Sequence, residues 1–97
     1  MTHFYMYYGY ARVSTTGHSL DIHHEHLKEY GCELIRSENK TGISTQGREA
    51  LNILLEFIRD GDSLVVTGLD RLARSMYDLQ TIVKTLRDHG ANLVITE

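Results

Sequence analysis

The 97-residue chain has no proline, no tryptophan and a single cysteine, Cys32. Without a second cysteine the chain cannot form an internal disulfide, which fits a protein of the reducing cytoplasm. No stretch approaches the ~18 apolar residues of a membrane span, and the N-terminus lacks the pattern of a secretory signal, so we expect no membrane association. Cys32 stands between a helix signal and a strand signal, and we expect it to be a small buried side chain.

An excess of positive charge is also missing. The chain has 10 basic and 13 acidic residues, a formal net charge of −3. Non-specific DNA-binding domains are usually basic, because contacts to phosphate drive their affinity. If this chain handles a polyanion, it must use a few placed arginines or a basic part that lies elsewhere. Seven of the ten basic residues are arginine, a bias that favours bidentate contacts to oxyanions.

Apolar periodicity alternates between the strand and helix patterns along the whole chain. Strands are expected at 5–13, 32–36, 63–67 and 92–96, and helices at 19–30, at about 51–58 before Gly61, and after a capping box of Ser75 and Asp78. The polar stretch 38–45 is expected to be a loop, mobile over 38–47 without DNA. This order predicts a single α/β domain with a mostly parallel four-stranded sheet, strand order 2-1-3-4, and helices on both faces.

The first predicted strand ends in an unusual pair of polar residues. Alternation along a strand puts Tyr8, Tyr10, Arg12 and Ser14 on one face. Arg12 and Ser14 are then roughly 6.5 Å apart, about the span of one phosphate. The strand is otherwise too apolar to hold the Arg12 charge without a partner.

A second polar group, Asp70, Arg71 and Arg74, follows the third predicted strand. If this segment is helical, its two arginines share a face. Taken alone, the segment could simply form solvated ion pairs. In the predicted strand order it lies beside Ser14, and Arg48 could add a further guanidinium. Arginines around a serine hydroxyl suit attack on a phosphodiester, whereas a carbonyl hydrolase would need a histidine base and a G-x-S-x-G elbow, which is missing.

Several short motifs occur together in a specific order and spacing. They are YARVST at 10–15, LD at 20–21, TG at 41–42, Arg48 before a helix, GD at 61–62 and LDRLARS at 69–75. In these motifs the chain resembles the serine recombinases, the resolvases and DNA invertases. The resemblance implies a resolvase-like catalytic domain over 1–97, with the family's dimerisation helix and C-terminal DNA-binding domain absent from these residues. It also implies site-specific DNA recombination or integration by mobile elements, and a homodimer that assembles into a tetramer on DNA.

The resemblance further implies roles for individual residues. Ser14 is the nucleophile that forms a 5′-phosphoserine link and frees a 3′-hydroxyl, without a metal, ATP or another cofactor. Arg12, Arg71 and Arg74 hold the scissile phosphate, and Asp70 is the family's acidic residue, its role open. Arg48 matches another active-site arginine, although it is followed by Glu49 where many members have proline. The remaining phosphate-site residues by this resemblance are His18, His23 and Thr41, the two histidines standing where the family often has glutamine.

Other interpretations of these residues remain open at this point. The histidines at 18, 23, 24 and 26 suggest a metal, but they lack a fourth ligand at a familiar spacing, so no metal site is predicted. We expect His24 to be partly buried between Leu20 and Leu27 and His26 to be solvated. The tyrosines at 5, 7, 8 and 10 could stack on bases, but an apolar strand favours buried rings. A non-covalent phosphate- or nucleotide-binding module and a hydrolytic phosphodiesterase are the alternative functions.

Overall fold

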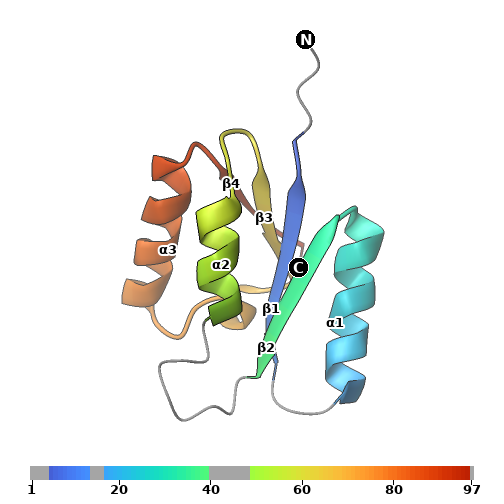
Figure 1. Ribbon diagram of the computed structural model, residues 1–97. Coiled ribbons are helices and arrows are strands. Elements are labelled where there is room, and N and C mark those ends of the chain that lie inside the picture. Colours follow the sequence, from blue (N-terminus) through green and yellow to red (C-terminus); the bar gives the residue numbers. More distant parts are fainter. Residues whose placement is uncertain (1–4, 14–16, 40–48, 97) are drawn as a thin grey trace.

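Four parallel strands form one sheet in the order β2-β1-β3-β4, as the sequence predicts (Figure 1). The computed structural model describes residues 5–13, 17–39 and 49–96. The strands are β1 (Tyr7–Val13), β2 (Leu34–Asn39), β3 (Ser63–Val66) and β4 (Asn92–Ile95). Tyr8 of β1 pairs with Leu34 of β2 on one side and with Leu64 of β3 on the other.

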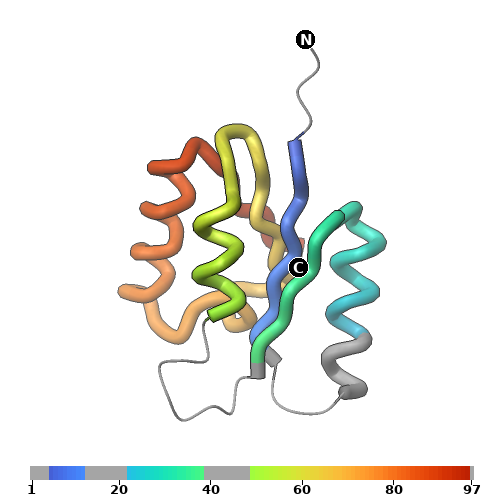
Figure 2. The backbone as a smooth tube through the Cα atoms, viewed as in Figure 1, coloured from blue at the N-terminus to red at the C-terminus, as the bar shows by residue number. Residues whose placement is uncertain are grey.

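Helices cover both faces of this sheet. The helix α1 (Gly17–Tyr30) lies on one face, and α2 (Glu49–Phe57) and α3 (Met76–Asp88) lie together on the other (Figure 1). A short 3-10 helix, η2 (Leu69–Arg71), connects β3 to α3. The carboxyl ends of β1 and β2 and the connection after β3 meet at one edge of the sheet, the lower edge in Figure 2. Both segments singled out from the sequence belong to this edge.

The core is divided between the two faces of the sheet. The larger cluster holds alternate residues of the central strands packed against α2 and α3, among them Tyr10, Leu54 and Leu86. The smaller cluster lies under α1 and includes Leu27 and Cys32. Burial raises the pKa of the Cys32 thiol to about 11, as expected for a small buried side chain.

The tyrosines of the N-terminal segment divide between core and surface. Tyr8 and Tyr10 are buried as predicted. Tyr5 precedes the strand and is exposed, and Tyr7 packs its partly exposed ring against Tyr30 of α1, with ring centroids 5.7 Å apart. The prediction of buried rings is therefore correct for one face of β1 only.

At the opposite edge of the sheet the GD motif has a structural role. Gly61 has a φ of +90°, which L side chains rarely adopt, and a Cβ there would collide with the ring of Tyr5, so glycine is favoured at this position. The buried carboxylate of Asp62 accepts the backbone N–H groups of Met6, at 3.0 Å, and Arg59, at 2.9 Å. These bonds fix the start of β1 and the turn before β3.

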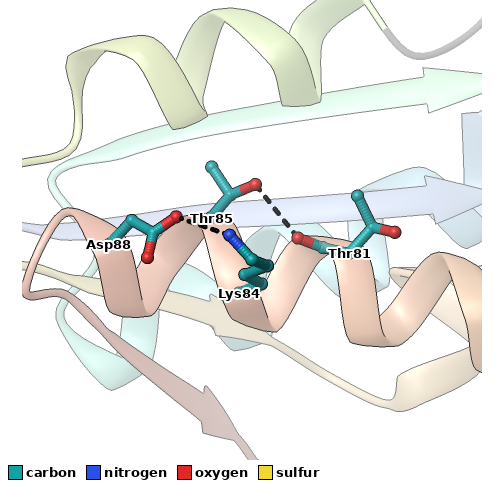
Figure 3. Close-up of polar contacts among 4 residues, drawn as sticks. All are labelled: Thr81, Lys84, Thr85 and Asp88. Atoms are coloured by element: carbon teal, nitrogen blue, oxygen red, sulfur yellow. Dashed lines mark hydrogen bonds and ion pairs between the residues drawn. The ribbon is translucent and has the colours of Figure 1, made fainter.

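The outer face of α3 is polar and solvated. Lys84 pairs with Asp88 one turn later, with Nζ and Oδ2 3.2 Å apart, and the Thr85 hydroxyl donates to the Thr81 carbonyl oxygen (Figure 3). At its N-terminus the Ser75 side chain accepts the Asp78 N–H at 3.1 Å, as the capping box predicts. No helix in the described part of the chain is both long and apolar enough to cross a membrane.

Two local predictions need correction. The loop expected at 38–45 begins later, because Glu38 and Asn39 still pair with β1 as part of β2. The rest of that predicted mobile segment, from residue 40, lies outside the described residues. The arginine-bearing segment is helical only over Leu69–Arg71, so Arg71 and Arg74 do not share a helix face.

Candidate active site

Arg12 is a buried charge at the carboxyl edge of the sheet. It lies next to the end of β1, and the residue is only 8% exposed. Strand alternation places it on the same face as Tyr8 and Tyr10, toward α2 and α3. Within the described residues its guanidinium has no hydrogen-bond or ion-pair partner. A buried unpaired charge is unfavourable, so this position is suited to receive an anion.

The segment after β3 lies against β1, as the strand order predicts. Leu72, fully buried, anchors the 3-10 helix η2 to the core. On this helix the Arg71 Nε and an Asp70 carboxylate oxygen are 3.8 Å apart, with side chains 28% and 69% exposed. An exposed pair at that distance adds little stability. The solvated ion pair considered from the sequence therefore forms, but it leaves Arg71 able to contact another anion.

Arg74 lies between η2 and α3 and is exposed. Its backbone N–H donates to the Asp78 side chain at 2.8 Å, which fixes the chain where it enters α3. The residue also lines a groove of about 280 Å³ between α2 and α3, together with Leu51 and Ile82. Because these two side chains belong to the larger core cluster, Arg74 lies on the same side of the sheet as Arg12.

Glu38 is a polar residue of this edge that the sequence reasoning missed. It is the register partner of Arg12 on the neighbouring strand. Its carboxylate accepts the buried Tyr10 hydroxyl, and its other oxygen accepts the Ala50 N–H at 2.8 Å, in the first turn of α2. A negative charge is favourable at a helix N-terminus. Glu38 therefore connects β1, β2 and the start of α2, the helix that directly follows Arg48 in the sequence.

The predicted histidines lie along α1. His23 is partly exposed, and its Nδ1 is 3.2 Å from the hydroxyl of Thr67, just after β3. His26 is exposed, as predicted, and its Nε2 is 2.9 Å from the hydroxyl of Thr96. His24 is exposed, so the prediction that it is partly buried is wrong. It stands next to the buried stripe of α1, which passes through Leu27.

The structure leaves other predicted site residues undescribed. Ser14, Thr41 and Arg48 lie outside the described residues, and of His18 only its backbone position in α1 is described. The residues that the structure brings to one edge are Arg12, Asp70, Arg71 and Arg74, with His23 reaching the same edge from the α1 side. The described residues contain no group of three or more histidine, cysteine or acidic side chains that could hold a metal.

Comparison with known families gives a match over almost the whole chain. The family model described as "Resolvase, N terminal domain" matches residues 7–97. The chain belongs to the resolvase family. This confirms the resemblance inferred from the motifs at the two strand ends.

Relatives of this resolvase-family chain are 40–49% identical to it in several bacteria and phages. The integrase-like protein y4lS of Sinorhizobium fredii is 49% identical over 92% of this chain, and the Tn552 DNA-invertase BinR of Staphylococcus aureus is 44% identical over 87%. The serine recombinase gin of Escherichia phage Mu is 41% identical over 90%. The chain covers 49%, 43% and 45% of these proteins, respectively, so it spans about half their length.

Solved structures agree with this assignment at the level of the fold. A resolvase family site-specific recombinase from Streptococcus pneumoniae superposes with a TM-score of 0.72 at 24% identity, covering 96% of this chain and 72% of that one. The first ORF of transposon ISC1904 from Sulfolobus solfataricus gives the same TM-score at 19% identity, covering 95% and 67%. The predicted resolvase-like α/β fold is therefore confirmed.

Proposed function

We propose that this chain is the catalytic domain of a site-specific DNA recombinase that cuts and rejoins strands through Ser14. The observation that carries the proposal is the buried Arg12 guanidinium, which has no partner among the described residues and lies beside the segment bearing Arg71 and Arg74. Such an arrangement suits a phosphodiester, whose non-bridging oxygens match the forked donors of arginine. The names of the relatives, invertases and recombinases among them, support DNA as the substrate.

The proposed reaction needs only groups of this chain and the DNA. The Ser14 oxygen attacks phosphorus, loses its proton, and forms a 5′-phosphoserine bond as the bond to the 3′-oxygen breaks. The 3′-oxygen leaves with a proton as a free hydroxyl. Arg12, Arg71 and Arg74 stabilise the charge that develops on phosphorus-bound oxygens. Because one phosphoester bond replaces another, rejoining by a 3′-hydroxyl requires no ATP, and the resemblance to the serine recombinases implies that it requires no metal.

The remaining assignments are part of the same proposal. Arg48, His18, His23 and Thr41 are proposed to line the phosphate site, with Asp70 beside its arginines. The partners are DNA and further copies of the chain, as a homodimer that forms a tetramer on DNA in the cytoplasm. The acidic net charge of −3 suggests that other sequence supplies most of the DNA affinity, which fits a chain half as long as its relatives.

The test looks for a covalent link between protein and DNA. The protein, and a hybrid in which it replaces the matching part of Tn552 resolvase, are incubated with plasmid DNA carrying that resolvase's recombination site. Denaturing gels should show an adduct that resists heat and detergent and disappears on protease treatment. Ser14→Ala should abolish the adduct, whereas Ser37→Ala, a change at an exposed serine of β2, should leave it intact.

The products separate this proposal from its alternatives. A hydrolytic phosphodiesterase would give free 5′-phosphate ends and no adduct. A non-covalent phosphate-binding module would leave the DNA uncut, and its Ser14→Ala variant would bind as before. Either result would overturn the proposed function.

A further inference from the structure

Two histidines of α1 reach hydroxyl groups at the carboxyl edge of the sheet. His23 meets Thr67 after β3, with Nδ1 and Oγ1 3.2 Å apart, and His26 meets Thr96 after β4, with Nε2 and Oγ1 2.9 Å apart. Strand alternation explains the geometry. Val65 belongs to the cluster under α1, so Thr67, two residues later, points to the same face.

Thr67 connects the first of these contacts to the proposed active site. The residue is only 2% exposed, and Gly68 separates it from the η2 helix that carries Asp70 and Arg71. Within the described part of the chain, the Thr67 hydroxyl has His23 as its only side-chain partner. A buried hydroxyl that loses its hydrogen-bond partner destabilises the fold. The contact with His23 therefore restrains Thr67, which directly precedes the segment 68–74.

We propose that His23 is a positioning residue for residues 68–74, acting through Thr67, and that it holds this segment best when its imidazole is neutral. The proposal rests on the proposed function, because the segment matters as the carrier of Arg71 and Arg74. The buried Thr67 proton needs an acceptor, and a neutral imidazole offers one at Nδ1. A protonated imidazole has donors only, so the hydroxyl proton is then left without that acceptor.

Several uncharged positions face His23 from the sheet. At this edge the strand positions that face α1 are Ala11, Ser37, Thr67 and Thr96, none of which is charged. One turn along α1 lies His26, and beyond Thr67 along the chain come Asp70 and Arg71. Because His26 is a second histidine of α1 in contact with a hydroxyl group, its variant must be a control.

Glutamine at position 23 separates hydrogen bonding from titration. The resemblance to the serine recombinases places glutamine where this chain has His23, and an amide can accept or donate without a change of charge. His23→Gln should therefore keep the restraint at every pH, whereas His23→Ala should lose it. His24→Gln, an exposed neighbour, and His26→Gln serve as matched controls.

The first experiment does not depend on catalysis. The backbone amide shifts of residues 68–74 are followed by NMR between pH 5.5 and 8 in the purified chain. These amide shifts should change with pH in parallel with the His23 imidazole signals. They should not change with pH in His23→Gln, and they should still change in His24→Gln and His26→Gln. If His23 titrates while these amides do not respond, or if the response persists in His23→Gln, the proposal is overturned.

The second experiment measures the initial rate of adduct formation against pH. If the neutral imidazole holds the segment, the rate should fall about two- to tenfold as the pH is lowered from 7.5 to 5.5, across the range in which histidine side chains change charge, and this step should be missing in His23→Gln. His23→Ala should be slow at both pH values. A step that survives in His23→Gln contradicts the positioning role. If no adduct forms with any variant, the proposed function fails, while the NMR result still decides the contact between His23 and residues 68–74.

Discussion

Replacing Arg12 by methionine should stabilise the protein and slow its reaction strongly. The residue is 8% exposed, and among the described residues nothing pairs with its guanidinium to offset the cost of removing the charge from water. Methionine has a similar length, is flexible and carries no charge. We therefore expect Arg12→Met to fold into the same structure without that cost.

The size of the effect follows from the environment of Arg12. Replacing a buried ion pair by apolar residues of similar volume is often neutral or stabilises a protein by about 1–4 kcal/mol, and the near-complete burial of Arg12 suggests a gain of about 1–3 kcal/mol. For a domain of this size each kcal/mol raises the melting temperature by about 4–8 °C. The same change removes one donor to the transferring phosphate, which should slow adduct formation by about 10²–10³-fold.

Urea and thermal unfolding of the wild type, Arg12→Met and Arg36→Met measure the first effect. Arg36 is an exposed arginine on β2 and the register partner of Tyr10, so its replacement should change the free energy of unfolding by less than about 0.5 kcal/mol. Added phosphate should stabilise the wild type more than Arg12→Met, because only the wild type keeps the buried cation. A loss of more than about 1 kcal/mol in Arg12→Met would refute the reasoning, since it would mean that the charge is already compensated.

Three further changes test other parts of the structure. Glu38→Gln should lower the free energy of unfolding by about 1–3 kcal/mol in urea titrations. The Tyr10 hydroxyl and the Ala50 N–H donate to different oxygens of the Glu38 carboxylate, and the amide keeps only one of these oxygens and no charge; an unchanged midpoint would argue against this connection. Ser75→Ala should lower the free energy of unfolding by about 1 kcal/mol in the same assay, because α3 loses its N-terminal cap. An unchanged free energy of unfolding would mean that Asp78 alone stabilises this end of the helix. With a pKa of about 11, the Cys32 thiol should react with iodoacetamide at pH 8 roughly a hundredfold more slowly than a free cysteine. In denaturant it should react as fast as a free cysteine, and fast labelling of the folded protein would contradict its burial.

Much of the fold follows from periodicity alone. The alternation of apolar strands and amphipathic helices predicts the parallel sheet, and right-handed crossovers leave few strand orders. The order 2-1-3-4 then brings the segment after β3 to β1, which the contact of η2 with β1 confirms. Arg12 could be identified because a guanidinium in an apolar strand demands an explanation.

The missed features depend on register and rotation, which one sequence does not reveal. The polar neighbours of Glu38 predict a loop, yet β2 is an edge strand whose last residues pair with β1. The useful signal was its place at the carboxyl end of a strand, where site residues collect in such sheets. The spacing of Leu20 and Leu27 predicts a partly buried His24, but this side chain is exposed. Thr67 could not be connected to His23 before the packing of α1 on the sheet was known.

The most direct test of the central claim is to find the residue that becomes bonded to DNA. The adduct is digested with nuclease and trypsin, which cuts after Arg12 and Lys28, and the peptide 13–28 is fragmented in a mass spectrometer. We predict a nucleotide attached through its 5′-phosphate to Ser14. An unmodified peptide 13–28 with the nucleotide elsewhere in the chain, or DNA cut without any attached peptide, would contradict the account.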